Sequence, residues 1–140
     1  FYTGQSRSAY SILLKQREKT RNRDEFQTLK AIKGIAEKMR QLLAGDGDLK
    51  EFGELLHEEW THKKRLVDGI SNESIDQYYD KALAAGAIGG KISGAGGGGF
   101  LLLYCEKDKQ GKVREALPEL KEVEFAFETA GTTVIDLNAY

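Results

Sequence analysis

The chain has 140 residues, the size of one domain and enough to bury a hydrophobic core. Its 21 basic and 22 acidic residues nearly balance, so no strong field favours nucleic acid or an anionic membrane as a partner. The apolar runs are far shorter than the roughly 18 residues of a spanning helix, and one cysteine, Cys105, excludes an intrachain disulfide. With no signal-peptide pattern at Phe1, these features predict a cytoplasmic protein.

The first 87 residues have the pattern of helices, because apolar residues recur at spacings of three and four. Four helices are expected there. The pair Asp48 and Glu51 forms a helix-start signal for the third of them. The expected bounds are Ser6 to Arg21–Asn22, Asp24 to Gly45, Asp48 to beyond Trp60, and Ser71 or Asn72 to Gly86.

The last 53 residues are mostly strand-like, so the chain is helix-rich in its first half. Helices followed by strands favour an α+β fold over a doubly wound sheet. Pro118 is expected to end or kink a helix near Gln110–Leu120. No linker divides the chain, which predicts a single domain over residues 1–140. The expected strands lie near Ile88–Ser93, Phe100–Cys105, Val123–Glu128 and Thr132–Leu137.

A glycine-rich run dominates the sequence, since eight of the sixteen glycines lie between Gly86 and Gly99. We refer to residues 93–99, between the first two expected strands, as the glycine loop. Glycine has no Cβ, so such a loop can adopt positive φ, and its bare N–H groups can form an anion-binding concavity. A flexible linker is the alternative, but linkers are polar at both ends, whereas this loop is flanked by Ile92 and an apolar strand. Phosphate or nucleotide contact is therefore favoured.

Two common phosphate motifs do not fit this context. Residues 94–99 satisfy G-x-G-x-x-G formally, but a strand follows where the dinucleotide fingerprint needs a helix. The P-loop pattern fails because Ala85 stands where its first glycine belongs and Ile92 where its Ser or Thr belongs. Neither motif is present.

Residues 91–98 instead resemble the third signature of the GHMP kinases, which reads roughly Lys-x-Ser/Thr-Gly-Ala-Gly-Gly-Gly. Within this family the stretches 1–9, 57–64 and 69–76 resemble heptose 7-phosphate kinases and related sugar kinases. The resemblance covers essentially the whole chain but only the C-terminal half of such an enzyme. The loop residues that it places at the phosphoryl-transfer cleft are Ser93, Gly94, Ala95, Gly96, Gly97 and Gly98.

The resemblance implies a ferredoxin-like antiparallel sheet packed by helices, with Phe1–Thr3 as an additional pairing strand. It implies an ATP-dependent kinase that phosphorylates the anomeric hydroxyl of a heptose 7-phosphate. An N-terminal ATP-binding domain, expected to be missing from this chain, would hold most of the ATP and Mg²⁺ and supply the catalytic acid. The chain would then carry no catalytic residue and no metal ligand, and would be inactive alone. The alternatives are another GHMP kinase, for fucose or another sugar, and a non-catalytic binding module that keeps the fold.

Five polar residues outside the loop are further candidates for binding the sugar phosphate. Ser6 and Arg7 stand at a helix N-terminus, where hydroxyl, backbone N–H and guanidinium groups suit phosphate, although simple N-capping by Ser6 remains an alternative. Lys63 and Lys64 can reach a phosphate or form a solvated helix end that favours the helix dipole. The fifth candidate is Lys91, in the glycine-rich run.

Two further expectations concern metals and partners. His57 and His62 lie five residues apart, roughly 140° around a helix, which prevents them from sharing a zinc ion. The apolar surface that would meet an N-terminal domain is left bare, so self-association of the chain is expected. Replacing Gly96 or Gly97 by alanine is expected to lower the rate of phosphoryl transfer with little change in melting temperature.

Overall fold

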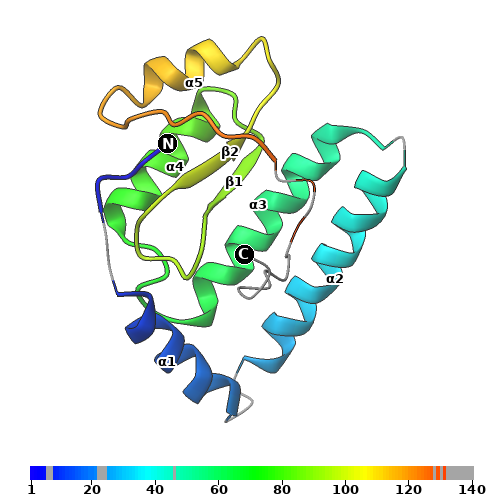
Figure 1. The fold of residues 1–140 in the computed structure, drawn as a ribbon, viewed down its shortest axis with the longest axis vertical. Helices are drawn as coiled ribbons and strands as arrows, with labels where there is room; N and C mark the ends of the chain where they lie inside the picture. Colours follow the sequence, from blue (N-terminus) through cyan, green and yellow to red (C-terminus); the bar gives the residue numbers. More distant parts are fainter. Residues whose placement is uncertain (6–7, 22–24, 46, 128, 130, 132–140) are drawn as a thin grey trace, which may run out of the picture.

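The computed structural model describes residues 1–5, 8–21, 25–45, 47–127, 129 and 131. Figure 1 shows long helices in the first half of the chain and a short antiparallel sheet in the second, so the predicted α+β class is confirmed. The elements are α1 (Ala9–Arg21), α2 (Phe26–Ala44), α3 (Leu49–Leu66), α4 (Glu73–Ala84), β1 (Gly89–Ile92), β2 (Leu101–Tyr104) and α5 (Gln110–Ala116).

The predicted start signals of α3 and α4 are confirmed by side-chain caps. The Asp48 carboxylate accepts a hydrogen bond from the backbone N–H of Lys50, and the Asn72 side-chain oxygen accepts one from Ile75 N. Each satisfies a donor that the first turn of a helix leaves without a partner. The predicted starts of α1 at Ser6 and of α2 at Asp24 lie outside the described residues.

Four segments line up in the sheet although only two are regular strands. β1 and β2 pair antiparallel, with Gly89 opposite Tyr104 and Ile92 opposite Leu101. Tyr2 forms antiparallel bridges to Phe100 on one side and to Lys121 on the other. The spatial order is therefore Lys121, Tyr2, β2, β1, the order of a ferredoxin-like sheet. The predicted pairing of Phe1–Thr3 is confirmed.

One prediction for the last part of the chain is confirmed and one is wrong. Pro118 ends α5 as predicted: the helix stops at Ala116, short of Leu120, because the ring of Pro118 excludes the residue before it from helical geometry. Residues 123–127 form no strand despite their alternating apolar pattern. No sheet face covers that pattern, since Phe125 and Phe127 remain 65% and 88% exposed. The expected strand at Thr132–Leu137 lies outside the described residues.

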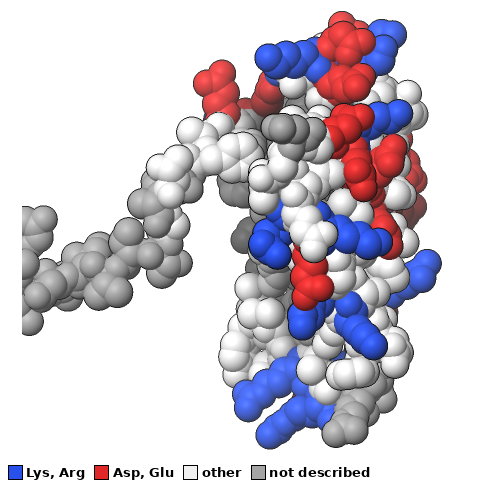
Figure 2. Space-filling model, turned by 90° about the vertical axis from the view of Figure 1, so that its right-hand side faces the viewer, with Lys and Arg blue, Asp and Glu red and all other residues white. Residues whose placement is uncertain are grey.

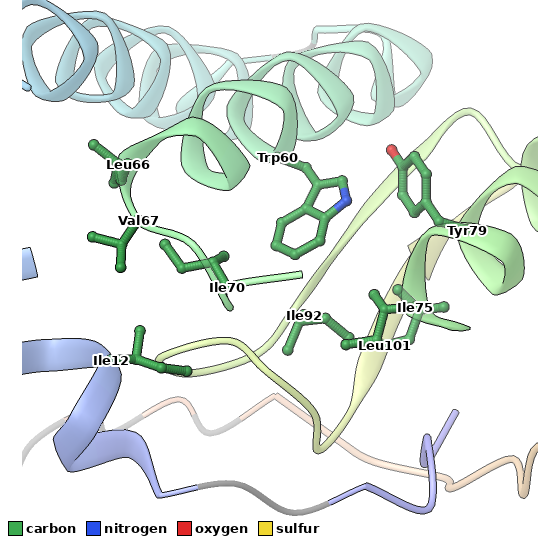
Figure 3. Close-up of a cluster of buried hydrophobic side chains, with 9 residues drawn as sticks. All are labelled: Ile12, Trp60, Leu66, Val67, Ile70, Ile75, Tyr79, Ile92 and Leu101. Atoms are coloured by element: carbon green, nitrogen blue, oxygen red, sulfur yellow. The ribbon is translucent and has the colours of Figure 1, made fainter. Parts of the chain in front are cut away.

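Trp60 occupies the centre of the main hydrophobic core and is completely buried (Figure 3). Ile12 is the buried residue of α1, and its side chain ties that helix to this core. A second cluster lies beneath α5 and includes Val113 and Leu117. The core members drawn in Figure 3 are Ile12, Trp60, Leu66, Val67, Ile70, Ile75, Tyr79, Ile92 and Leu101.

The helix α3 lies directly against β1, with α2 outside it (Figure 1). A Cβ atom on Gly89 would overlap the carbonyl oxygen of Gly53, so the close approach of helix to strand requires glycine at that point. Figure 2 shows basic side chains gathered toward the end of the molecule where Figure 1 places α1, with acidic ones more frequent toward the opposite end. None of the described helices combines the length and hydropathy needed to cross a membrane.

Candidate functional site

The glycine loop joins β1 to β2 and has the backbone geometry that its composition predicts. Its five glycines all have positive φ, with values from +78° at Gly97 to +150° at Gly98. Side chains with a Cβ rarely adopt this region, because it costs about 1–2 kcal/mol per residue. The sequence of the loop is therefore needed for its conformation.

One side of the loop is packed against the rest of the domain. The N–H of Gly97 donates to the carbonyl oxygen of Ile70 at 2.8 Å, and the N–H of Gly99 donates to that of Gln5 at 2.8 Å. A Cβ atom on Gly96 would stand only 2.7 Å from Ile70 O, and one on Gly98 only 2.6 Å from Gln5 O. This geometry corrects the expectation that Gly96→Ala would leave the melting temperature nearly unchanged, because the added methyl group collides with backbone.

The other side of the loop is open. A Cβ atom on Gly94 or on Gly99 would meet no atom within 4 Å. Within the described part of the chain, the backbone N–H groups of Gly94, Ala95, Gly96 and Gly98 have no hydrogen-bond acceptor. A loop that is fixed from behind, with N–H donors left over, has the construction of an anion-binding concavity.

Two of the candidate lysines lie at this loop. The Nζ of Lys63, in the last turn of α3, donates to the carbonyl oxygen of Gly94 at 2.8 Å. The Nζ of Lys91, in β1, lies 2.7 Å from the Glu59 carboxylate. Burial lowers the pKa of Lys63, and the charge of Lys91 lowers it further, with Glu59 acting in the opposite direction.

Lys64 faces a different partner from Lys63. Its Nζ donates to the Asp76 carboxylate at 2.9 Å, and the Ser71 hydroxyl donates to the same oxygen at 2.9 Å. This group lies at the first turn of α4. The predicted pair of neighbouring lysines is therefore divided between the glycine loop and the start of α4. Ser6 and Arg7 lie outside the described residues.

The residues that hold the loop in place could not be identified from the sequence. Ile70 and Gln5 act through backbone carbonyls, which no residue pattern reveals. Asn72 was predicted only as a helix cap, yet its Nδ2 also donates to the Gln5 side chain at 2.8 Å. Asn72 thus links the start of α4 to the segment that binds the loop. The acidic partner of Lys91, Glu59, was likewise missed.

His57 takes part in a polar contact between α3 and α4. Its Nδ1 lies 2.8 Å from the Tyr79 hydroxyl, and the two rings stack with centroids 5.8 Å apart. Burial raises the pKa of Tyr79 to about 12, a hydrogen bond from the Gly90 backbone acting in the opposite direction. No three His, Cys, Asp or Glu side chains among the described residues gather as metal ligands.

Comparison with known proteins finds a matching family, similar sequences and a similar fold. Residues 30–122 match the family described as GHMP kinases C terminal. The chain is 30% identical over 117 residues to the D-glycero-alpha-D-manno-heptose 7-phosphate kinase of Campylobacter jejuni, covering 84% of this chain and 34% of that protein. It is 31% identical over 124 residues to the bifunctional fucokinase/GDP-fucose pyrophosphorylase of Arabidopsis thaliana, covering 86% of this chain and 12% of that protein.

A solved mevalonate kinase has a similar fold. The fold matches that of L. major mevalonate kinase, solved in complex with R-mevalonate, with a TM-score of 0.74 and 22% identity over 84% of this chain and 36% of that one. The chain thus spans about a third or less of the length of these relatives. The family match covers most of the chain, including the glycine loop and Lys63, which contacts it. The chain belongs to the GHMP kinase C-terminal domain family.

Proposed function

We propose that this chain is the C-terminal domain of an ATP-dependent sugar kinase that phosphorylates the anomeric hydroxyl of a heptose 7-phosphate. The glycine loop carries this proposal, because it combines a packed side, an open side and N–H donors without acceptors among the described residues. The heptose substrate rests on the similarity to the Campylobacter jejuni kinase. The whole enzyme would act in the cytoplasm.

In this function the loop positions the reacting groups. Phosphoryl transfer is catalysed mainly by alignment and charge stabilisation, so backbone donors contribute without acting as nucleophile or base. The free N–H groups of Gly94, Ala95 and Gly96 would point toward the oxygens of the transferring phosphoryl group, and the exposed Ser93 side chain would border them. Lys63 would add positive charge at the edge of the loop.

The described residues of this chain suit the phosphates of ATP better than they suit Mg²⁺. Backbone N–H donors and a lysine suit the phosphates of ATP. The described carboxylates do not form a metal-ligand group, so Mg²⁺ would be held mainly by an N-terminal domain. That domain would also supply the catalytic acid, and Ser6 and Arg7 would approach the sugar phosphate from the first segment of this chain. When bound, the ion would supply positive charge that offsets the charge of the phosphates.

A second candidate is a kinase for fucose or a similar sugar. The sequence identity to the Arabidopsis thaliana enzyme is 31%, against 30% to the heptose kinase, and the two matches cover 86% and 84% of this chain. A non-catalytic module that keeps the fold is less well supported, because the glycine loop retains every residue of the family pattern.

The test measures ADP release by the longer protein that contains this chain, with heptose 7-phosphate, fucose and mevalonate supplied in parallel. We expect turnover with heptose 7-phosphate at the highest kcat/KM, and none from the 140-residue chain alone. Turnover only with fucose or mevalonate rejects the heptose assignment, and no turnover with any acceptor rejects the kinase function. Product analysis by phosphorus NMR locates the new phosphate on the anomeric oxygen or elsewhere.

A further inference from the structure

The three candidate lysines differ in what balances their charge. Lys64 is paired with the carboxylate of Asp76, and Lys91 with that of Glu59. Lys63 has no carboxylate within 4 Å among the described residues and contacts only the neutral carbonyl oxygen of Gly94. Of these three lysines, Lys63 therefore brings the positive charge that the described carboxylates leave unpaired.

The hydrogen bond to Gly94 O holds the ammonium group of Lys63 at the glycine loop. An ammonium has three N–H donors, of which the carbonyl oxygen takes one. Gly94 is also the position where an added Cβ would meet no atom within 4 Å. The two remaining N–H donors of Lys63 therefore lie next to open space, beside the N–H groups of Gly94 and Ala95 that have no acceptor in the described chain.

The surroundings of Lys63 favour the arrival of an anion. The group is half-buried, which removes part of its hydration, and the nearby Lys91 repels it. Glu59, an acidic group whose charge acts on Lys63, is already in contact with Lys91. A negatively charged ligand at this point would relieve the repulsion and replace the lost hydration with charge-assisted hydrogen bonds.

We infer that Lys63 binds a phosphate group of a ligand against the open side of the glycine loop, and that Lys64 and Lys91 do not. The ligand is a phosphate monoester or polyphosphate, supplied by a sugar phosphate or by a nucleotide. Lys91 instead holds β1 to α3 through Glu59, and Lys64 stabilises the start of α4 through Asp76. This inference rests on the proposed function and assigns the phosphate-binding role within the site to one side chain.

The experiment follows the backbone amide signals of the glycine loop by ¹⁵N NMR in the 140-residue chain. Inorganic pyrophosphate, ATP and heptose 7-phosphate are titrated separately, and the tightest of the three identifies the source of the phosphate. We expect Lys63→Gln to raise the Kd by about tenfold to a hundredfold, the range of one charge-assisted hydrogen bond, and Lys63→Arg to keep most of the affinity. Lys33→Gln, an exposed change on α2, is the control for net charge.

Equal weakening by Lys63→Gln and Lys33→Gln overturns the inference, because the ligand would then sense only net charge. Loop signals that none of the three ligands perturbs also overturn it. A second measurement needs no substitution: in the ¹³C-labelled chain, the Cε signal of each unmodified lysine is followed by NMR as the pH is varied. Pyrophosphate should raise the pKa of Lys63, and an unchanged pKa of Lys63 contradicts the proposal.

These outcomes are separable from the fate of the proposed function. Binding of pyrophosphate that depends on Lys63, in a protein that phosphorylates no sugar, supports this inference and rejects the kinase assignment. Sugar kinase activity together with pyrophosphate binding that Lys63→Gln leaves unchanged supports the kinase assignment and rejects the role of Lys63.

Discussion

The ammonium of Lys91 lies 2.7 Å from the carboxylate of Glu59, and this ion pair joins β1 to the middle of α3. The side chains are only 28% and 11% exposed. Charges withdrawn from water to this extent are tolerated because they neutralise each other. The pair therefore fixes β1, the strand that leads into the glycine loop. Each of the two charges needs the other to offset the cost of its burial.

Removing one member of this pair should destabilise the fold more than removing both. Lys91→Met leaves the Glu59 carboxylate buried without its counterion, and we expect a loss on the order of 3 kcal/mol in the free energy of unfolding. The double change Lys91→Met with Glu59→Leu should recover most of that loss. Urea denaturation of the parent and both variants checks this. A double variant no more stable than the single one would show that packing, and not charge, dominates here.

Alanine should affect the two sides of the glycine loop differently. At Gly96 the methyl group collides with Ile70 O and φ is +99°, so we expect a loss of more than 2 kcal/mol, above the roughly 1–2 kcal/mol of positive φ alone. At Gly94 the space is open, and only the backbone penalty of about 1 kcal/mol applies. Gly94→Asn should lose less still, because asparagine tolerates positive φ. Denaturation curves that rank Gly94→Ala below Gly96→Ala in stability contradict the packing described here.

Asn72 has two separable roles, as the cap of α4 and as the link to Gln5. Asn72→Ser keeps a capping oxygen but is too short to reach Gln5, whereas Asn72→Ala loses both contacts. We expect Ser to lie near the parent in stability and Ala to be about 1 kcal/mol lower. Hydrogen exchange at the amide of Gly99, which bonds to Gln5 O, should accelerate in both variants. Unchanged exchange of the Gly99 amide in both variants would show that Asn72 does not stabilise the loop.

Tyr79 should make the fold sensitive to alkaline pH. The pKa of Tyr79 is raised from 10.0 to about 12, so the folded state holds this proton more tightly than the unfolded state does. Its contribution to stability is then complete below pH 10 and is lost as the pH rises through about 12. Tyr79→Phe should flatten the decline in unfolding free energy over this window, and Tyr78→Phe should retain it. Parallel curves for the two variants would assign the decline to other groups.

Local signals in the sequence predicted most of the fold. The caps at Asp48 and Asn72 and the break at Pro118 act within a few residues, so the starts of α3 and α4 and the end of α5 follow from neighbouring residues alone. The alternation at Val123, Phe125 and Phe127 misled the prediction, because a strand also needs a partner edge and a face to cover. That information is not local.

The site was predicted in its composition but not in its contacts. The glycine loop could be located because a backbone without side chains requires glycine, and glycine can be read directly from the sequence. The different roles of Lys63, Lys64 and Lys91 could not be predicted, since each depends on which carboxylate or carbonyl the fold brings to it. Ile70 and Gln5, whose carbonyls fix the loop, contribute through groups that every residue has.

The double pairing of Tyr2 has a consequence for how the domain folds. Its segment lies between β2 and Lys121, although Phe100 is 98 positions and Lys121 119 positions further along the chain. Contacts this distant in sequence form late, because a long loop must close before they stabilise anything. During synthesis Tyr2 has to remain without its sheet partners until Phe100 and Lys121 have left the ribosome. We therefore expect the helices to form first and the sheet to be completed last, together with the hydrogen bond from Gly99 N–H to Gln5 O.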